Sequence, residues 1–531
     1  MPTARLDLRH RDALFDALET GPFDVAVIGG GITGAGVARD AAKRGLRVAL
    51  IEQRDFGAGT SSRSSKMIHG GLRYLPMGDL ALVREAASER KAVQAIAPHL
   101  ARETPFVIPA KTAAVIAKLR AGLWTFEKLG GVPKSRKHEV WSQKDVVARE
   151  PALRADDLAG AVVYPEYLTD DARLTLANVR DAAAHGALVL NYARADALVL
   201  ENGQAVGIAV TDALPGAAGD PARKARLTAR VIVNAAGPWV DAIRALEDAG
   251  AAPRLKLTKG VHLVVSRERL PVDRTIILPA ADKRSVFAVP RGETTYIGTT
   301  DTFYPQLDLW PAITAQDADY LLDAVALRAA GLRLTHADIL SAWSGVRPLV
   351  AEEGKSASEI SRKDELWTGP AGVLAIAGGK LTAYRKMAER VVDRIEETLG
   401  RKPSPCRTDS DPLPGGDVDV DRATASLIDH GLEPPAARRL VDLYGSEAPA
   451  VALHGGDVAA EARHAVEAEG ALTLEDYWVR RGARAWFDPA PERLAQAAAA
   501  MAPLLGWSPQ EAERQIAACQ AIWDQNMSAL R

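Results

Sequence analysis

Three glycines, Gly29, Gly31 and Gly34, directly follow an apolar stretch that ends at Ile28, and they fit the pattern GxGxxG. The first glycine of this pattern makes a tight turn, the second lets a pyrophosphate approach backbone N–H groups, and the third lets a helix pack closely on a strand. Glu52 closes the next apolar stretch about 20 residues later, where a carboxylate can accept hydrogen bonds from both ribose hydroxyls. The sequence therefore predicts a dinucleotide-binding turn rather than a flexible corner.

This turn needs a strand, a helix and a second strand to position it. Residues 24–28 (DVAVI) predict a short buried strand, and residues 47–51 (RVALI) predict the second. The alanine-rich stretch 32–43 between them predicts the helix. The complete βαβ context makes cofactor binding the favoured interpretation.

Three later stretches indicate which dinucleotide binds. A hydroxyl-rich loop joined to paired glycines spans residues 59–75, and two further predicted strands, within 229–240 and 372–391, also end in small residues or glycines. Strand-end sites spread over about 350 residues suit one long ligand across the carboxyl edge of a sheet, whereas NAD usually needs only the first site. We therefore expect FAD. The cofactor contacts expected beyond the first turn and Glu52 are Thr60, Ser61, Ser65, Lys66, His69, Gly70, Ala236, Gly237, Gly379, Lys380, Leu381 and Thr382.

Composition narrows the class of protein. The 531 residues have ordinary globular composition and a formal net charge of -2, so nothing global indicates nucleic acid. The two cysteines, Cys406 and Cys519, form no CxxC pair, which suits a reducing compartment. We expect no metal site, because His and carboxylates never cluster at ligand spacing, and no signal peptide or transmembrane helix.

The order of several motifs resembles one flavoprotein family. The chain reads GTSSRSSKMIHGGLRYL, YLTDDARL, NAAGPWV, KGVHLVV, IGTTD, SGVRPL and GGKLTAYRKMAE, from about residue 22 to its end. This series is similar to the FAD-dependent, quinone-linked glycerol-3-phosphate dehydrogenases, which have the D-amino-acid oxidase fold. The first 20 or so residues lie outside the resemblance.

The resemblance implies oxidation of sn-glycerol 3-phosphate to dihydroxyacetone phosphate, with hydride transfer from C2 to flavin N5. Because arginine forks bind phosphate bidentately, Arg73 and Arg347 are the main phosphate candidates, and Arg362 is a weaker one. By the same resemblance, Arg347 also stabilises the developing alkoxide. Tyr74 and Thr299 are expected to contact the substrate through their hydroxyls, although both equally fit packing roles.

Proton removal requires a base whose pKa is near the working pH. The resemblance assigns this role to His262 in KGVHLVV, with His69 as the competitor, whereas a lone histidine on an apolar strand is often a core residue. Lys380 lies where a cation favours negative charge on the flavin ring. The expected catalytic residues are therefore His262, Arg347 and Lys380.

The predicted fold class is α/β, with three domains. The Rossmann-like FAD-binding domain is discontinuous and comprises 22–105, 160–250 and 340–400, after an N-terminal extension, 1–21. Short alternating strands predict an antiparallel substrate domain from 106–159 and 251–339, including a helix over 317–329 with Thr314 as N-cap. A proline- and serine-rich linker, 401–416, precedes an all-helical C-terminal domain, 417–531.

The resemblance also implies membrane quinone as the electron acceptor, so a membrane-surface element is expected. Residues 111–137 carry seven Lys or Arg and one acid. Val115, Leu119, Leu123 and Phe126 share one helical face, with Trp124 beside it, which suits an interfacial helix or, equally, a core-facing helix with a solvated basic face. We expect a cytoplasmic protein, peripheral on the cytoplasmic face of the inner membrane.

Three alternatives stay open. A glycerol-3-phosphate oxidase would pass electrons to O2 and make peroxide. An oxidase of amino or hydroxy acids on the same fold would need one carboxylate clamp rather than several cations. A non-catalytic flavin-binding interaction protein would not be reduced by substrate. The C-terminal stretch RRGARAWFDPA shows no catalytic pattern, and a homodimer held by this domain also stays open.

Overall fold

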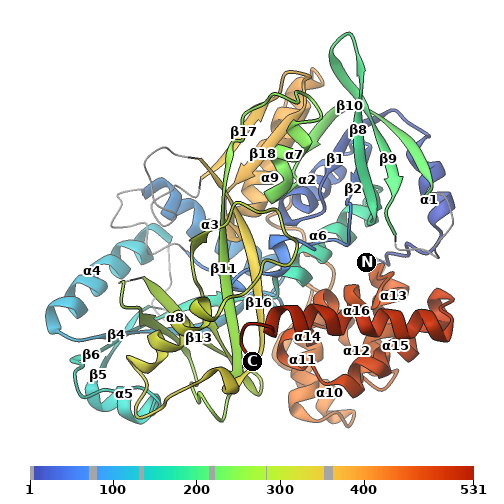
Figure 1. Cartoon of the computed structure of the whole chain (residues 1–531). Coiled ribbons are helices and arrows are strands. Elements are labelled where there is room, and N and C mark those ends of the chain that lie inside the picture. Colours follow the sequence, from blue (N-terminus) through green and yellow to red (C-terminus); the bar gives the residue numbers. More distant parts are fainter. Residues whose placement is uncertain (1–4, 71–79, 131–136, 215–221, 283, 352–362) are drawn as a thin grey trace.

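The computed structural model describes residues 5–70, 80–130, 137–214, 222–282, 284–351 and 363–531. Two β-sheets and a group of C-terminal helices make up the molecule. In Figure 1 the first sheet and its helices lie at the top, the second sheet lies at the lower left, and the C-terminal helices lie at the lower right. The predicted fold class is confirmed.

The first sheet has the order β17-β18-β10-β1-β2-β7, with the β8–β9 hairpin paired onto β10. Strand β1 runs parallel to β2 and β10, and β18 runs parallel to β10, so their carboxyl ends share one edge. The strands are β1 (Phe23–Ile28), β2 (Val48–Ile51), β7 (Leu188–Leu190), β8 (Ala193–Glu201), β9 (Gln204–Asp212), β10 (Lys224–Asn234), β17 (Asp364–Thr368) and β18 (Leu374–Gly378).

Both faces of this sheet are covered, as its near-continuous apolar strands require. Helices α2 (Ile32–Lys43), α6 (Asp171–Ala184) and α9 (Tyr384–Thr398) pack on one face. The other face contacts the β8–β9 hairpin and α1 (Arg11–Leu18), whose Phe15 and Leu18 are buried. This helix falls in the expected N-terminal extension, 1–21, and it is part of the first sheet's core.

The second sheet is mostly antiparallel, as predicted, and β4 and β12 form a parallel pair within it. Its longest pairing is the antiparallel pair β11–β16, at one end of the described strand order. The strands are β3 (Met67–Ile68), β4 (Arg102–Ala110), β5 (Glu139–Ser142), β6 (Gly160–Leu168), β11 (Leu255–Ser266), β12 (Thr275–Pro279), β13 (Ser285–Arg291), β14 (Thr294–Gly298), β15 (Thr302–Phe303) and β16 (Ile339–Val350).

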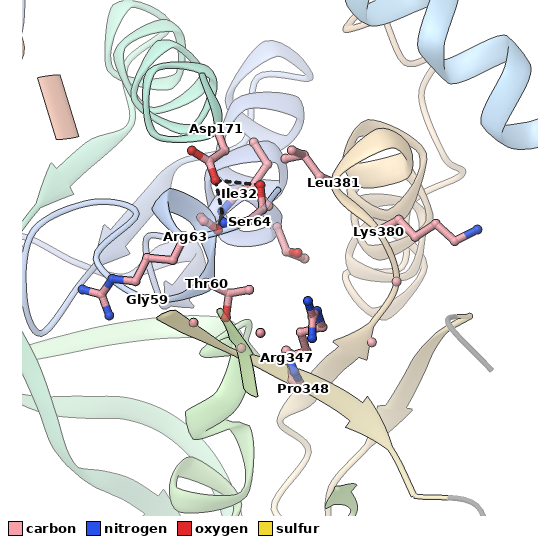
Figure 2. A pocket seen from close by; sticks show the side chains of 18 of the residues that line it. Ile32, Gly59, Thr60, Arg63, Ser64, Asp171, Arg347, Pro348, Lys380 and Leu381 are labelled. Carbon is pink, nitrogen blue, oxygen red and sulfur yellow. Dashed lines mark hydrogen bonds between the residues drawn. The ribbon is translucent and has the colours of Figure 1, made fainter. Parts of the chain in front are cut away.

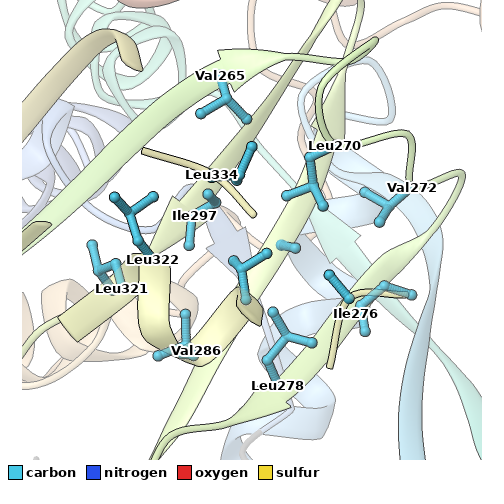
Figure 3. Packing of buried hydrophobic residues seen from close by; sticks show 14 of the residues in the cluster. Val265, Leu270, Val272, Ile276, Leu278, Val286, Ile297, Leu321, Leu322 and Leu334 are labelled. Carbon is cyan, nitrogen blue, oxygen red and sulfur yellow. The ribbon is translucent and has the colours of Figure 1, made fainter. Parts of the chain in front are cut away.

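An aliphatic core holds this sheet against α8 (Ala315–Ala326). Figure 3 shows Leu321 and Leu322 of the helix facing Val286 and Ile297 of the strands. The helix begins at a capping box in which Thr314 and Asp317 exchange hydrogen bonds, so the predicted N-cap is confirmed.

The remaining helices are arranged in two groups. Those before residue 400 are α3 (Leu80–Ile96), α4 (Ala113–Gly130), α5 (Gln143–Arg149) and α7 (Val240–Arg244). Those of the C-terminal domain are α10 (Val420–Asp429), α11 (Pro434–Tyr444), α12 (Ala448–Ala452), α13 (Val458–Glu469), α14 (Arg484–Phe487), α15 (Pro491–Leu505) and α16 (Pro509–Met527).

The sheets divide the chain differently from the expected domain boundaries. Strands β6 and β16 were expected in the FAD-binding domain, but each pairs along its length within the second sheet. The stretch 401–416 is also packed, since Leu413 is buried and the Thr408 carbonyl accepts a hydrogen bond from Arg39. Strand period alone does not reveal a strand's partner, which explains the difference.

Candidate active site

A cavity of about 1450 Å³ runs from the carboxyl ends of β1, β10 and β18 to the second sheet. Small-molecule sites usually occupy about 300–1000 Å³, so this cavity has room for a dinucleotide and a substrate together. Figure 2 shows its walls: Thr60 and Ser64 lie on one side, Lys380 and Leu381 on another, and Arg347 and Pro348 on β16 below. The strand-end sites expected from sequence meet in this cavity.

The first glycine turn allows only glycine at two points. Gly29 has φ +108°, and a Cβ there would lie 2.7 Å from the Ala235 carbonyl oxygen. A Cβ on Gly34 would lie 1.9 Å from the Gly29 carbonyl oxygen, so α2 passes directly over the turn. Gly31 lines the cavity as α2 begins, and Ser61 Oγ accepts the Ile32 N–H at 2.9 Å. The turn has the geometry expected of a pyrophosphate cradle.

Glu52 lines the cavity at the end of β2. Its carboxylate accepts the N–H of Gly30 at 2.7 Å and the N–H of Arg54 at 2.9 Å. Burial raises the pKa of Glu52, and these two backbone hydrogen bonds oppose that rise. The carboxylate is therefore fixed against the glycine turn, where a ribose hydroxyl can reach it.

The hydroxyl-rich loop divides into residues that line the cavity and residues that hold the loop. Thr60, Ser61, Ser65 and His69 line the cavity. Lys66 and Gly70, both expected at the cofactor, do not: Lys66 is buried with its Nζ 2.5 Å from Asp171, and the Gly70 N–H donates to Glu166. Thr382 likewise lies behind the cavity and exchanges hydrogen bonds with the His69 backbone. These three residues position the loop.

The other two strand ends complete the wall. Ala236 and Gly237 follow β10, Gly379, Lys380 and Leu381 follow β18, and all five line the cavity. In Figure 2 the Lys380 side chain extends away from Arg347. These positions match the sequence expectation for the walls of a cofactor site.

The pairing register of β11 and β16 determines which residues lie at the polar end of the cavity. His262, Gly260 and Thr258 lie opposite Trp343, Gly345 and Arg347. These alternate positions share one face of the sheet. A Cβ on Gly260 would lie 2.2 Å from Arg347 Nη2, and one on Gly345 would lie 2.9 Å from Arg63 Cβ. The two glycines therefore leave space for the Arg347 guanidinium and for the hydroxyl-rich loop.

Arg347 lies in a network with Thr299 and Asp301, and all three line the cavity. Its Nη2 donates to Thr299 Oγ1 at 3.0 Å, and its Nη1 lies 3.1 Å from Asp301 Oδ1. Arg284, which the sequence analysis missed, also lines the cavity and donates to the Asp301 carbonyl oxygen at 3.0 Å. Two guanidinium groups therefore flank one residue at the cavity wall. Arg73, Tyr74 and Arg362 lie outside the described residues.

His262 does not line the cavity. It is buried, its ring stacks on Trp343 with centroids 4.6 Å apart, and its Nε2 lies 2.9 Å from Ser65 Oγ. Burial, then the positive charges of Arg347 and Lys66, hold the pKa of His262 well below its usual value. The imidazole is therefore neutral at pH 7, and among the described residues its hydrogen-bond link to the cavity is the Ser65 hydroxyl.

Arg63 is a second residue that the sequence analysis left without a role. It lines the cavity while its guanidinium stacks 3.5 Å from the centroid of the Trp310 ring, and burial lowers its pKa to about 9. Its position in the hydroxyl-rich loop was a signal for it. Arg284 had no such signal, because only the pairing of β12, β13 and β14 brings it to the cavity.

The site combines a cradle for a long dinucleotide with a cationic wall and a neutral buried imidazole. This combination defines a flavin-dependent oxidoreductase. A family model described as FAD dependent oxidoreductase matches residues 24–385, and one described as the C-terminal domain of alpha-glycerophosphate oxidase matches residues 406–512. Within the described residues no group of His, Cys, Asp and Glu could hold a metal ion.

Known proteins refine this class. The chain is 39% identical over 506 residues to an aerobic glycerol-3-phosphate dehydrogenase of Bacillus subtilis, covering 90% of each chain, and 38% identical to one of Staphylococcus aureus, with the same coverage. The glycerol-3-phosphate dehydrogenase of Bacillus halodurans complexed with FAD has a similar structure, with TM-score 0.81, 33% identity and 99% of each chain covered. The chain belongs to the FAD-dependent glycerol-3-phosphate dehydrogenase family, and its cofactor is FAD.

Proposed function

We propose that this enzyme oxidises sn-glycerol 3-phosphate to dihydroxyacetone phosphate by hydride transfer from C2, and that membrane quinone receives the electrons. The observation that carries the proposal is the pair Arg284 and Arg347, which flank Asp301 in the same cavity as the glycine turn. Guanidinium forks suit a phosphate dianion because they donate two parallel hydrogen bonds. The names of the relatives support this choice of substrate.

FAD, when bound, supplies the hydride acceptor at N5 of its flavin ring. The protein's residues then have to hold the phosphate and take the C2 hydroxyl proton. Ser65 faces the cavity and contacts His262 Nε2. We assign the proton to a relay: the substrate hydroxyl donates to Ser65 Oγ as Ser65 passes its own proton to the neutral His262.

The other expected contacts have supporting roles in this proposal. Thr299 orients the Arg347 guanidinium through its hydroxyl. Lys380 contributes positive charge to the cofactor wall. Arg73 and Tyr74 remain predicted substrate contacts, and Arg362 remains a further phosphate candidate.

Electron transfer to quinone requires contact with a membrane surface, and we assign this contact to α4. Its residues Val115, Lys118 and Leu119 line the cavity, so the helix lies at the route from the cofactor to the outside. The side chains of Val115 and Trp124 are 43% and 52% exposed. Leu123 and Phe126 are buried instead, so the apolar face predicted from sequence is divided between core and solvent.

Two further observations bear on location. Among the described helices, none combines the length and hydropathy needed to cross a bilayer. Both cysteines are free thiols, which is consistent with a reducing compartment. We propose that the enzyme lies peripherally on the cytoplasmic face of the inner membrane.

The test is an anaerobic titration of the holoenzyme with sn-glycerol 3-phosphate, followed by the yellow flavin absorbance. We expect bleaching by the phosphate ester and none by glycerol. Arg347→Ala should raise the concentration needed for half-bleaching on the order of a hundredfold, because it removes a charged phosphate contact. Arg267→Ala, which changes an exposed arginine outside the cavity, is the control and should leave the titration unchanged.

Two results would contradict parts of the proposal. An unbleached flavin would remove glycerol 3-phosphate as the substrate. Bleaching followed by rapid reoxidation in air, with peroxide formed in step and no reduction of a soluble quinone, would replace quinone by O2 as the acceptor.

A further inference from the structure

The C-terminal stretch RRGARAWF, Arg480–Phe487, contacts the wall of the cofactor site from outside. Arg480 and Arg481 end the helical turn Asp476–Arg481, and both are buried. Neither lines the cavity. Their partner lies in the loop that follows Glu52.

Asp55 is fully buried, and the C-terminal domain supplies most of its hydrogen bonds. Its Oδ2 accepts Arg480 Nε at 2.5 Å and also accepts Arg481 Nη1. Its Oδ1 accepts Arg481 Nη2 at 3.0 Å and Asn191 Nδ2 at 3.1 Å. A buried carboxylate is stable only when such partners replace water, so the loop cannot move independently of the two arginines.

The same loop holds the ribose-facing carboxylate. Asp55 follows Glu52 by three residues, and Arg54 between them lines the cavity and donates its N–H to Glu52. Tyr192, between β7 and β8, also holds this loop, because its backbone N–H donates to the Arg54 carbonyl oxygen at 2.7 Å. The Tyr192 hydroxyl donates to Asp476 at 2.6 Å, and Asp476 also accepts Arg480 Nη2. The C-terminal domain therefore fixes the loop by two routes.

We propose that Arg480 and Arg481 are positioning residues for FAD: by binding Asp55 they hold Glu52 in the geometry that receives the adenosine ribose. The C-terminal domain thereby controls retention of the cofactor without touching it. This inference rests on FAD binding and is independent of the identity of the substrate.

The test compares two conservative variants of neighbouring arginines. Arg481→Lys keeps the charge but removes the fork on Asp55. Arg484→Lys makes the same change at a buried arginine of the same stretch, whose partners Glu461, Tyr477 and Asp488 all lie within the C-terminal domain. FAD release from each purified holoenzyme is followed after dilution by the rise in flavin fluorescence, and the unfolding temperature is measured beside it.

We expect Arg481→Lys to release FAD on the order of tenfold faster than the parent enzyme, because it loses charge-assisted hydrogen bonds to the ribose loop. Arg484→Lys should release FAD at the parent rate. With excess FAD, Arg481→Lys should regain its kcat, and its KM for glycerol 3-phosphate should be unchanged.

Equal release from both variants would overturn the proposal, since the effect would then be general loosening of the domain. Parent-like release from Arg481→Lys would also overturn it. If Arg481→Lys does not fold, Asp55→Asn decides from the other side, because it removes the charge with little change of shape. We call the hydrogen bonds of Arg480 and Arg481 to Asp55 the Asp55 clasp. Accelerated FAD release from Asp55→Asn supports the role proposed for this clasp, and unchanged release overturns it.

Discussion

The His262 side chain is buried and closely packed. Trp343 stacks on its face, Tyr296 meets it edge to face, and a Cβ on Gly298 would lie 2.1 Å from its Cδ2. Its pKa is lowered, so the neutral form persists below the usual pKa of histidine. The neutral form is the one that can accept a proton as a base. For the fold, the lowered pKa means that this buried ring becomes protonated only at low pH.

Replacing this imidazole tests the relay. His262→Asn should slow flavin reduction by glycerol 3-phosphate on the order of 10²- to 10⁴-fold, because it removes a positioned base. In the parent enzyme the reduction rate should show no fall from His262 protonation as the pH drops through about 6.5, since its folded pKa lies lower. Anaerobic stopped-flow measurements across pH check both points.

His336→Asn is the control, because His336 is a histidine of intermediate exposure, paired with Asp319 away from the cavity. A variant at His262 that reduces its flavin as fast as this control would remove the imidazole from the proton path.

Sequence reasoning went furthest where function depends on local spacing. The glycine turn and Glu52 need only neighbouring residues, so their pattern predicted their geometry. The placement of His262 behind Ser65 depends on the β11–β16 register and on a loop from elsewhere in the chain. Spacing along one strand contains no information about either, which is why the cavity-facing partner of His262 could not be predicted.

Helix α4 shows the same limit at the scale of an element. Its bounds, Ala113–Gly130, fall within the predicted basic stretch, but its buried and exposed sides depend on what packs against it. Leu123 and Phe126 join the core, whereas Val115 and Trp124 face solvent. The interfacial and the core-facing interpretations of this stretch therefore each describe part of the helix.

The exposed part of α4 predicts membrane affinity. Val115→Ser with Trp124→Ser should lower binding to vesicles that contain phosphatidylglycerol on the order of tenfold, because it removes apolar area that would enter the interface. Cosedimentation measures binding, and flavin reduction by glycerol 3-phosphate is measured beside it because Val115 also lines the cavity.

Val147→Ser is the matched control, since Val147 on the neighbouring α5 is similarly exposed at 54% but does not line the cavity. If both changes leave vesicle binding alike, the membrane contact does not lie at α4.

At the scale of the whole molecule, buried ion pairs join the C-terminal domain to the first sheet's helices. Arg173 and Arg180 of α6 meet Glu469 and Glu447 from the C-terminal side, in addition to the clasp on Asp55. In the sequence these are ordinary charged residues of amphipathic helices. Their burial follows from docking of the two units, so the sequence analysis left this domain without a role.

These pairs predict sensitivity to acid. Burial raises the pKa of Glu469, but the nearby positive charges, that of Arg173 first, outweigh this effect and lower the pKa to about 2, below its ordinary value of 4.5. A folded-state pKa below the unfolded one stabilises the protein above the unfolded pKa, and this stability is lost as the pH falls through the folded value. The free energy of unfolding should therefore lose on the order of 3 kcal/mol from this group between about pH 5 and pH 2.

Urea unfolding at pH 7 and across this acid range measures the loss. Glu469→Gln should be less stable at pH 7, because it leaves Arg173 buried without its carboxylate, and its stability should fall less steeply with acid. An equally steep fall in the variant would show that other carboxylates account for the acid response.

The span of the Asp55 clasp has a consequence for how the enzyme is made. Asp55 and Arg480 are separated by 425 positions. A ribosome delivers the glycine turn early and the two arginines almost last, and domains begin to fold from the N-terminal side during synthesis. A nascent chain therefore cannot close its coenzyme-retaining loop until translation is nearly finished, and a product truncated before the clasp should leave the ribosome colourless.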